Sequence, residues 1–207
     1  MHYQPSGKPE KDRSQLAVWF SKAPVTHEVY TRGTGQALPT TPSAEVPYIV
    51  QGQEIPPVLS ANGTLRKGKI PNIPPYTENW EIVGATAVTE AITLYALSPH
   101  MHVRGKDLTW KITWPDGRDE TILSVPRYDF NWQINYELDK PLKLPAGSKI
   151  TAVGHYDNSF KNRYNPAPEK QVYWSDQSWD EMFIPYIEYT IDSQRLNKAA
   201  ATTQQQR

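Results

Sequence analysis

Short apolar segments separated by turns run along most of the chain, and their period is that of β-strands. Residues 108–114 (LTWKITW) alternate apolar and polar side chains, and the turn sequence PDGR follows them. Residues 121–125 (TILSV) then return, so the two segments predict a β-hairpin. Residues 91–97 (AITLYAL) and 149–155 (KITAVGH) are apolar runs of the kind found in buried strands. The pattern predicts an all-β chain.

Weaker versions of this pattern predict further strands. They cover residues 15–20, 48–50, 80–83, 172–174 and 183–191. Residues 128–133 are aromatic and polar by turns, and we expect Tyr128, Phe130 and Trp132 in the core. Strands that recur about every 8–12 residues are typical of sandwiches and barrels. We therefore expect a jelly-roll-like antiparallel β-sandwich.

Composition agrees with this fold and excludes several classes of function. Among the 207 residues are 19 prolines, 7 tryptophans and 12 tyrosines, which is typical of a β domain with many turns. The 22 basic residues balance 22 acidic ones, so neither nucleic acid nor a membrane is an expected partner. The chain has no cysteine, which excludes disulfides, thiolate ligands and a cysteine nucleophile. No apolar run is as long as a membrane span.

The chain divides into three parts. Residues 1–24 begin abruptly with a strand end at His2, and we expect them to be a remnant of a preceding domain. Residues 25–192 form the main domain, in which the Gly- and Pro-rich residues 31–79 are expected to be mostly loop. Residues 193–207 form a polar tail with AAA and QQQ runs, which we expect to be disordered.

Two of the five histidines stand in one tripeptide, His100-Met101-His102, soon after the apolar run 91–97. In a continuing strand, alternation points both imidazoles to one face, about 7 Å apart at the backbone, and Met101 to the other. Two imidazoles so placed can converge on one metal ion. Taken alone, the pair is as compatible with a structural role as with half of a metal site.

The other histidines have different interpretations. His27 stands in a loop without companions, and we expect a surface histidine without a function. His155 ends an apolar strand and precedes the sequence DNS at residues 157–159, which most simply caps a turn. We interpret His155 as a hydrogen-bonded core histidine, with a third imidazole near the metal as the alternative.

Three segments resemble one family: HMH at 100–102, WDEM at 179–182 and YIEY at 186–189. The family is that of the copper type II, ascorbate-dependent monooxygenases, such as peptidylglycine alpha-hydroxylating and dopamine beta-monooxygenase. Bacterial members look closer still, in the stretches SPHMH, VPRYDFNW and DNS. The resemblance covers nearly the whole chain but only the C-terminal half of the family's two-domain core.

The resemblance implies both a reaction and a set of site residues. His100, His102 and Met182 would bind the copper at which dioxygen is activated, and Tyr186 would line the catalytic pocket. His2 would ligate a second, electron-transferring copper, whose His-His pair lies in the missing N-terminal domain. The implied reaction is ascorbate-dependent hydroxylation of an aliphatic C–H bond in an unknown small molecule, and the chain alone is expected to be inactive. A periplasmic or secreted location is implied too, although the chain begins without a signal peptide.

The chain also departs from the family. Ser98 stands where the peptide enzymes have an arginine that holds the substrate carboxylate, and Ile184 replaces a substrate-facing asparagine. The segment 31–79 looks longer than the corresponding connection in the animal enzymes. Peptidylglycine is therefore not the expected substrate.

The chemistry of the ligand set agrees with copper. Thioether sulfur favours Cu(I), while imidazole serves both oxidation states, and zinc would more often use cysteine or carboxylate. Met182 lies 80 residues beyond His102, so only folding can bring it to the ion, and spacing alone favours a core methionine. Asp180 and Glu181 either tune the site from outside the ligand shell or form a turn at a strand end.

Two other functions stay open. A cupin-like enzyme would hold iron, manganese or zinc through His100, His102 and His155. Cupins have a carboxylate a few residues after the pair, whereas residues 103–106 are VRGK. The other alternative is a non-catalytic β-sandwich that stores copper or binds a partner.

Overall fold

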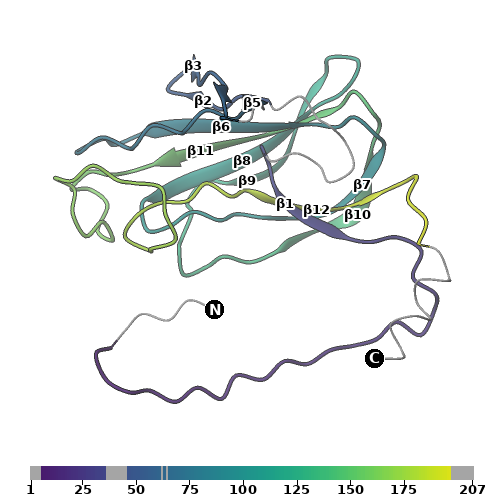
Figure 1. The fold of residues 1–207 in the computed structure, drawn as a ribbon, viewed down its shortest axis with the longest axis horizontal. Helices are drawn as coiled ribbons and strands as arrows, with labels where there is room; N and C mark the ends of the chain where they lie inside the picture. Colours follow the sequence, from purple (N-terminus) through teal and green to yellow (C-terminus); the bar gives the residue numbers. More distant parts are fainter. Residues whose placement is uncertain (1–5, 36–45, 62, 64, 197–207) are drawn as a thin grey trace.

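The computed structural model describes residues 6–35, 46–61, 63 and 65–196. Every regular element in these residues is a β-strand, and the strands pair antiparallel. The strands form two main sheets (Figure 1), which confirms the predicted all-β sandwich. The jelly-roll connectivity stays a prediction. The described residues contain no helix of the length and apolarity that crossing a membrane requires.

The first sheet carries one half of the core. Its four strands lie in the order β1-β12-β7-β10. Their bounds are Tyr30–Gly33 for β1, Tyr186–Ile191 for β12, Ile92–Ser98 for β7 and Tyr136–Leu144 for β10. β7 lies between two neighbours and is buried along nearly its whole length. That burial explains why it reads in the sequence as a continuous apolar run.

The second sheet has six strands in the order β3-β2-β6-β11-β8-β9. Their bounds are Gln53–Glu54, Ile49–Val50, Trp80–Ala87, Lys149–Tyr156, Gly105–Thr113 and Asp119–Val125, in that order. β8 and β9 form the hairpin that the sequence predicted, with Gly117 of its turn at a φ of 85°. Two short strands, β4 (Val58–Leu59) and β5 (Leu65–Arg66), pair separately.

The core lies between the two main sheets. It contains fully buried side chains from both, among them Leu94, Ile187, Trp110 and Ile150. Phe183, just before β12, also packs into this core.

Two glycines make room for the ring of Phe183. A Cβ atom added at Gly154 of β11 would lie 2.8 Å from this ring, and one added at Gly84 of β6 would lie 3.0 Å from it. The ring therefore lies directly on the backbone of the second sheet, and this contact fixes the depth of the segment that precedes β12.

The N-terminal residues of the described chain differ from the prediction. Residues 15–20 form no strand, and Trp19 is 86% exposed. Figure 1 shows residues 6–26 running apart from the sandwich, and all their side chains are exposed. An apolar run without a sheet beside it has no ladder to join, which is why the predicted strand is wrong here. His2, with the strand end predicted around it, lies outside the described residues.

The sequence pattern did not predict the two edge strands of the first sheet. β1 and β10 flank the first sheet, and β10 contains Pro141 and several charged residues. The pairing of β10 with β7 shifts register between Glu137 and Leu142, so the proline stands at an irregularity on an edge strand. Proline and charge are tolerated there because one side of the strand needs no ladder hydrogen bonds.

The residues after β12 fold back on the segment before β1. The backbone N–H of Leu196 donates to the carbonyl of Thr26, at 3.0 Å. The guanidinium of Arg195 lies 2.8 Å from Nε2 of His27, whose Nδ1 is 2.9 Å from the hydroxyl of Thr26. His27 thus lies at the surface, as expected, but it has Thr26 and Arg195 as hydrogen-bond partners there. Residues 193–196 of the expected disordered tail are described, and the rest of that tail lies outside the description.

We predict that Gly154→Ala lowers the free energy of unfolding by about 1–3 kcal/mol, because the new methyl group overlaps the ring of Phe183. Urea denaturation followed by circular dichroism measures the change. Lys149→Ala, at an exposed position of the same strand, is the control and should stay within about 0.5 kcal/mol of wild type. Equal stability of the two variants would contradict the packing of Phe183 against β11.

Candidate metal centre

The tripeptide His100-Met101-His102 lies in the loop between β7 and β8. β7 ends at Ser98 and β8 begins at Gly105, so the expected continuation of the strand through the histidines is wrong. The side chains are nevertheless arranged as expected. The two imidazole rings have centroids 5.3 Å apart and perpendicular planes, and Met101 is fully buried in the core.

The hydroxyl of Tyr128 pins the middle of this loop. It accepts a hydrogen bond from the backbone N–H of Met101 at 3.1 Å and donates one to the carbonyl of Met101 at 2.5 Å. Burial raises the pKa of Tyr128, which keeps the hydroxyl protonated and able to donate. Gly105 leaves the space that the ring needs, because a Cβ atom there would lie 2.6 Å from it.

The carboxylate of Glu181 holds the second half of the loop. It is fully buried and accepts hydrogen bonds from the backbone N–H groups of His102, at 2.7 Å, and Arg104, at 2.6 Å. Burial raises the pKa of Glu181 to about 8, although these two bonds and the charge of Arg104 act in the opposite direction. Because Glu181 contacts the peptide groups of the loop, it positions the histidines through the backbone.

Hydrogen bonds also set the tautomer of each imidazole. Nδ1 of His100 is 2.6 Å from Oε1 of Gln133, and Nδ1 of His102 is 3.3 Å from the carbonyl oxygen of Asp180. The amide N–H of Gln133 donates to the carbonyl of Phe130, which fixes the orientation of that amide. Both oxygens facing the rings can only accept, so each Nδ1 carries the proton and each Nε2 carries the lone pair. This is the usual arrangement of metal-binding histidines.

The spacing of the rings fits a shared ion. A nitrogen–metal bond of about 2.0–2.1 Å places an imidazole centre about 3.2 Å from the ion. Two such rings at a near-tetrahedral angle have centres about 5 Å apart. The observed distance between the ring centroids of His100 and His102 is 5.3 Å. This distance is compatible with two ligands of one tetrahedral site, and it is also that of an ordinary edge-to-face contact between two rings.

Met182 lies between two residues, Glu181 and Ile184, that are hydrogen-bonded to the histidine loop. The carboxylate of Glu181 holds the N–H of His102, and the N–H of Ile184 donates to the carbonyl of His100 at 3.0 Å. Tyr156 donates from its hydroxyl to the carbonyl of Met182 at 2.6 Å, and Met182 is half-buried. Folding thus brings the backbone of Met182 next to the histidine pair.

Tyr186 also lies beside the pair. It is the first residue of β12 and pairs with Ser98, the last residue of β7. Its ring centroid is 6.2 Å from that of His100. A molecule bound at the imidazoles would therefore have Tyr186 close to it, while His2, the predicted ligand of a second copper, lies outside the described residues.

His155 lies on the outward face of β11. Its Nδ1 is 2.6 Å from Oδ1 of Asp107, and its Nε2 is 3.4 Å from Oε2 of Glu81. Both carboxylates stand opposite it in register on the neighbouring strands. His155 is hydrogen-bonded as predicted but is not a core residue. In the described part of the chain, no three His, Asp or Glu side chains are grouped to hold a metal, so the cupin-like set with His155 is not assembled.

The loop between β9 and β10, residues 126–135, supplies contacts that the sequence did not reveal. Tyr128 holds the backbone of Met101, Gln133 holds His100, and the ring of Phe130 is 5.8 Å from that of His102. Trp132 is 66% exposed, so its expected place in the core is wrong. The only signal was the mixture of aromatic and amide residues in one short stretch.

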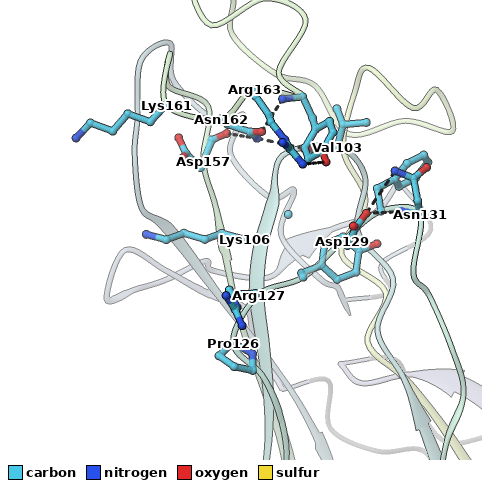
Figure 2. A pocket seen from close by; sticks show the side chains of 14 residues that line it. Val103, Lys106, Pro126, Arg127, Asp129, Asn131, Asp157, Lys161, Asn162 and Arg163 are labelled. Carbon is cyan, nitrogen blue, oxygen red and sulfur yellow. Dashed lines mark hydrogen bonds between the residues drawn. The ribbon is translucent and has the colours of Figure 1, made fainter.

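A pocket of about 430 Å³ lies between residues 126–131 of this loop and residues 157–164 (Figure 2). Its lining includes Lys106, Arg127, Tyr128, Phe130, Lys161 and Arg163. Neither imidazole belongs to the lining, but Phe130 of the lining has its ring 5.8 Å from that of His102. The four cationic side chains are all exposed, and Figure 2 shows Lys106 and Lys161 extending outward on the same side. The pocket is therefore a neighbour of the candidate metal centre and not part of it.

Comparisons with known proteins add nothing to this geometry, because neither the family models nor the curated proteins searched match the chain. The resemblance to copper monooxygenases therefore rests on the sequence motifs and stays a prediction.

We predict that Tyr128→Phe lowers the free energy of unfolding by about 1–3 kcal/mol, because the buried N–H and C=O groups of Met101 both lose their hydroxyl partner. Guanidinium denaturation of the metal-free protein measures it. Tyr164→Phe, at an exposed position, is the matched control. A loss no greater than that of Tyr164→Phe would show that the hydroxyl does not hold the loop.

Proposed function

We propose that this chain is the oxygen-activating, copper-binding domain of an ascorbate-dependent copper monooxygenase that hydroxylates an aliphatic C–H bond. The observation that carries the proposal is the histidine pair. Both rings are held in the tautomer that leaves Nε2 as the ligand atom, at a spacing that suits one tetrahedral ion. The adjoining segment contributes Met182, whose thioether favours Cu(I).

The residues of this chain would act as ligands and as their supports. His100 and His102 would bind the ion through Nε2, and Met182 would bind it through sulfur. Glu181 and Tyr128 would keep the loop in place while the oxidation state of the ion changes, because neither is itself a ligand. When bound, copper supplies one-electron redox chemistry and a place for dioxygen. Tyr186 would contact the substrate beside His100.

The reaction needs more than this site provides. Hydroxylation of one C–H bond consumes one dioxygen, two electrons and two protons, and it releases one water. Ascorbate is the proposed donor of the two electrons, and a second copper ligated by His2 and by a preceding domain is the proposed relay. The proposed setting is periplasmic or secreted. We therefore propose that this chain binds copper by itself but does not hydroxylate by itself.

We predict one tight Cu(I) site per chain, weakened at least tenfold by Met182→Leu, which keeps the volume of the side chain but removes the sulfur. Competition with a chromophoric Cu(I) chelator measures the affinity. Cu(II) binding should change less, because imidazole serves both oxidation states.

His155→Ala is the control, and we expect it to lower the melting temperature, since Asp107 and Glu81 lose their shared partner, while copper affinity stays unchanged. Unchanged Cu(I) affinity in Met182→Leu would remove the methionine from the ligand set. Loss of copper in His155→Ala with an unchanged melt would make His155 a ligand instead of a structural residue.

We further predict that ascorbate with the copper-loaded chain gives no substrate hydroxylation coupled to oxygen uptake. An oxygen electrode and product analysis measure this, with free copper at equal concentration as the control for uncatalysed ascorbate oxidation. A second tight copper that is lost in His2→Ala would show that the relay site is complete in this chain.

A further inference from the structure

A second cavity, of about 490 Å³, is lined in part by Trp179 and Asp180, which belong to the segment that carries Met182. Its lining includes Arg104, Lys170, Tyr173, Trp179 and Asp180, and it includes none of the three proposed copper ligands. The volume is in the range of cavities that bind small molecules. The side chains that line it indicate which kind of molecule would fit.

Arg104 is the unusual member of this lining, because only 2% of it is exposed. Its Nε donates to Oδ1 of Asn158 at 2.8 Å, and its Nη1 donates to the carbonyl of Trp179 at 2.6 Å. Both acceptors are neutral, and within the described part of the chain no carboxylate forms an ion pair with this guanidinium. A guanidinium has five N–H donors, so part of it remains for a further acceptor.

The nearest acidic groups have other partners. Both carboxylate oxygens of Glu181 accept hydrogen bonds from backbone N–H groups, and Oδ2 of Asp180 accepts one from the hydroxyl of Ser175 at 2.5 Å. A buried cation is costly unless it is paired, so the cavity beside Arg104 is a place where an anion would be stabilised.

The rim of the cavity supplies a second cation and two aromatic surfaces. Lys170 is exposed and contributes another positive charge. Tyr173 is 57% exposed and Trp179 is 54% exposed, so both rings have faces open to a ligand. The pocket of Figure 2 lacks this combination, because its four cations are all exposed and Lys161 already forms an ion pair with Glu78.

We propose that this cavity binds a small organic carboxylate with a flat, aromatic body. The carboxylate lies against Arg104 and Lys170, and the body packs against Tyr173 and Trp179. The inference is independent of copper, because it uses no proposed ligand of the metal.

Calorimetric titration of the metal-free protein with benzoate tests this site. We expect one benzoate per chain with a dissociation constant of about 1 mM or tighter. Benzamide, which has the same shape without the charge, and acetate, which has the charge without the ring, should each bind at least tenfold more weakly. Benzamide or acetate binding as tightly as benzoate would overturn the proposal, as would tighter binding of inorganic phosphate.

Variants locate the bound molecule. Lys170→Gln and Trp179→Ala change exposed rim side chains, and each should weaken benzoate about three- to tenfold without a change in melting temperature. Lys111→Gln, which removes the same charge from an exposed position of β8, is the matched control and should bind as wild type. Arg104→Lys should bind benzoate at least tenfold more weakly. If this variant fails to fold, the two rim variants alone test the site.

Wild-type affinity in both rim variants would overturn the site. His102→Ala should bind benzoate normally even if it has lost copper, so a failure of the copper proposal and a failure of this one give different results.

Discussion

The structure depends on the hydrogen bonds that the peptide groups of one loop, between β7 and β8, form outside the sheets. Between β7 and β8 the chain has no strand beside it, yet it is largely buried, and buried N–H and C=O groups need partners. Tyr128 serves both groups of Met101, and Glu181 serves the N–H groups of His102 and Arg104. Because Glu181 comes from the segment that also contains Met182, the bonds that stabilise the loop also place the proposed third ligand beside the pair.

That segment is itself fixed by the second sheet. The ring of Phe183 lies on the backbone of β6 and β11 at two glycines, and the hydroxyl of Tyr156 holds the carbonyl of Met182. The N–H of Ile184 then reaches the carbonyl of His100. The candidate centre is thus built where a segment anchored in one sheet meets the end of a strand in the other, and its geometry follows from core packing.

The sequence predicted those strands that have a regular pattern of apolar residues. The alternating residues of β8 and the apolar run of β11 were both predicted as strands, close to their observed bounds. The alternation of β11 also implied that His155 points outward, since Ile150 and Tyr156 of the same strand point inward, but the apolar run obscured this parity. Contacts between a side chain and a distant backbone, such as those of Glu181, have no period, so only the folded chain reveals them.

The bonds that build the loop have a consequence on its other side. Glu181 and Arg104 are buried near each other, but the carboxylate oxygens accept from two amides and not from the guanidinium. The positive charge of Arg104 is therefore left facing a cavity, where two neutral oxygens satisfy only part of it. Residues 179–182 contact both places: the carbonyl of Trp179 binds Arg104, and the next carbonyl binds His102. An ion at the histidines and an anion in the cavity would therefore both lie beside this one short segment.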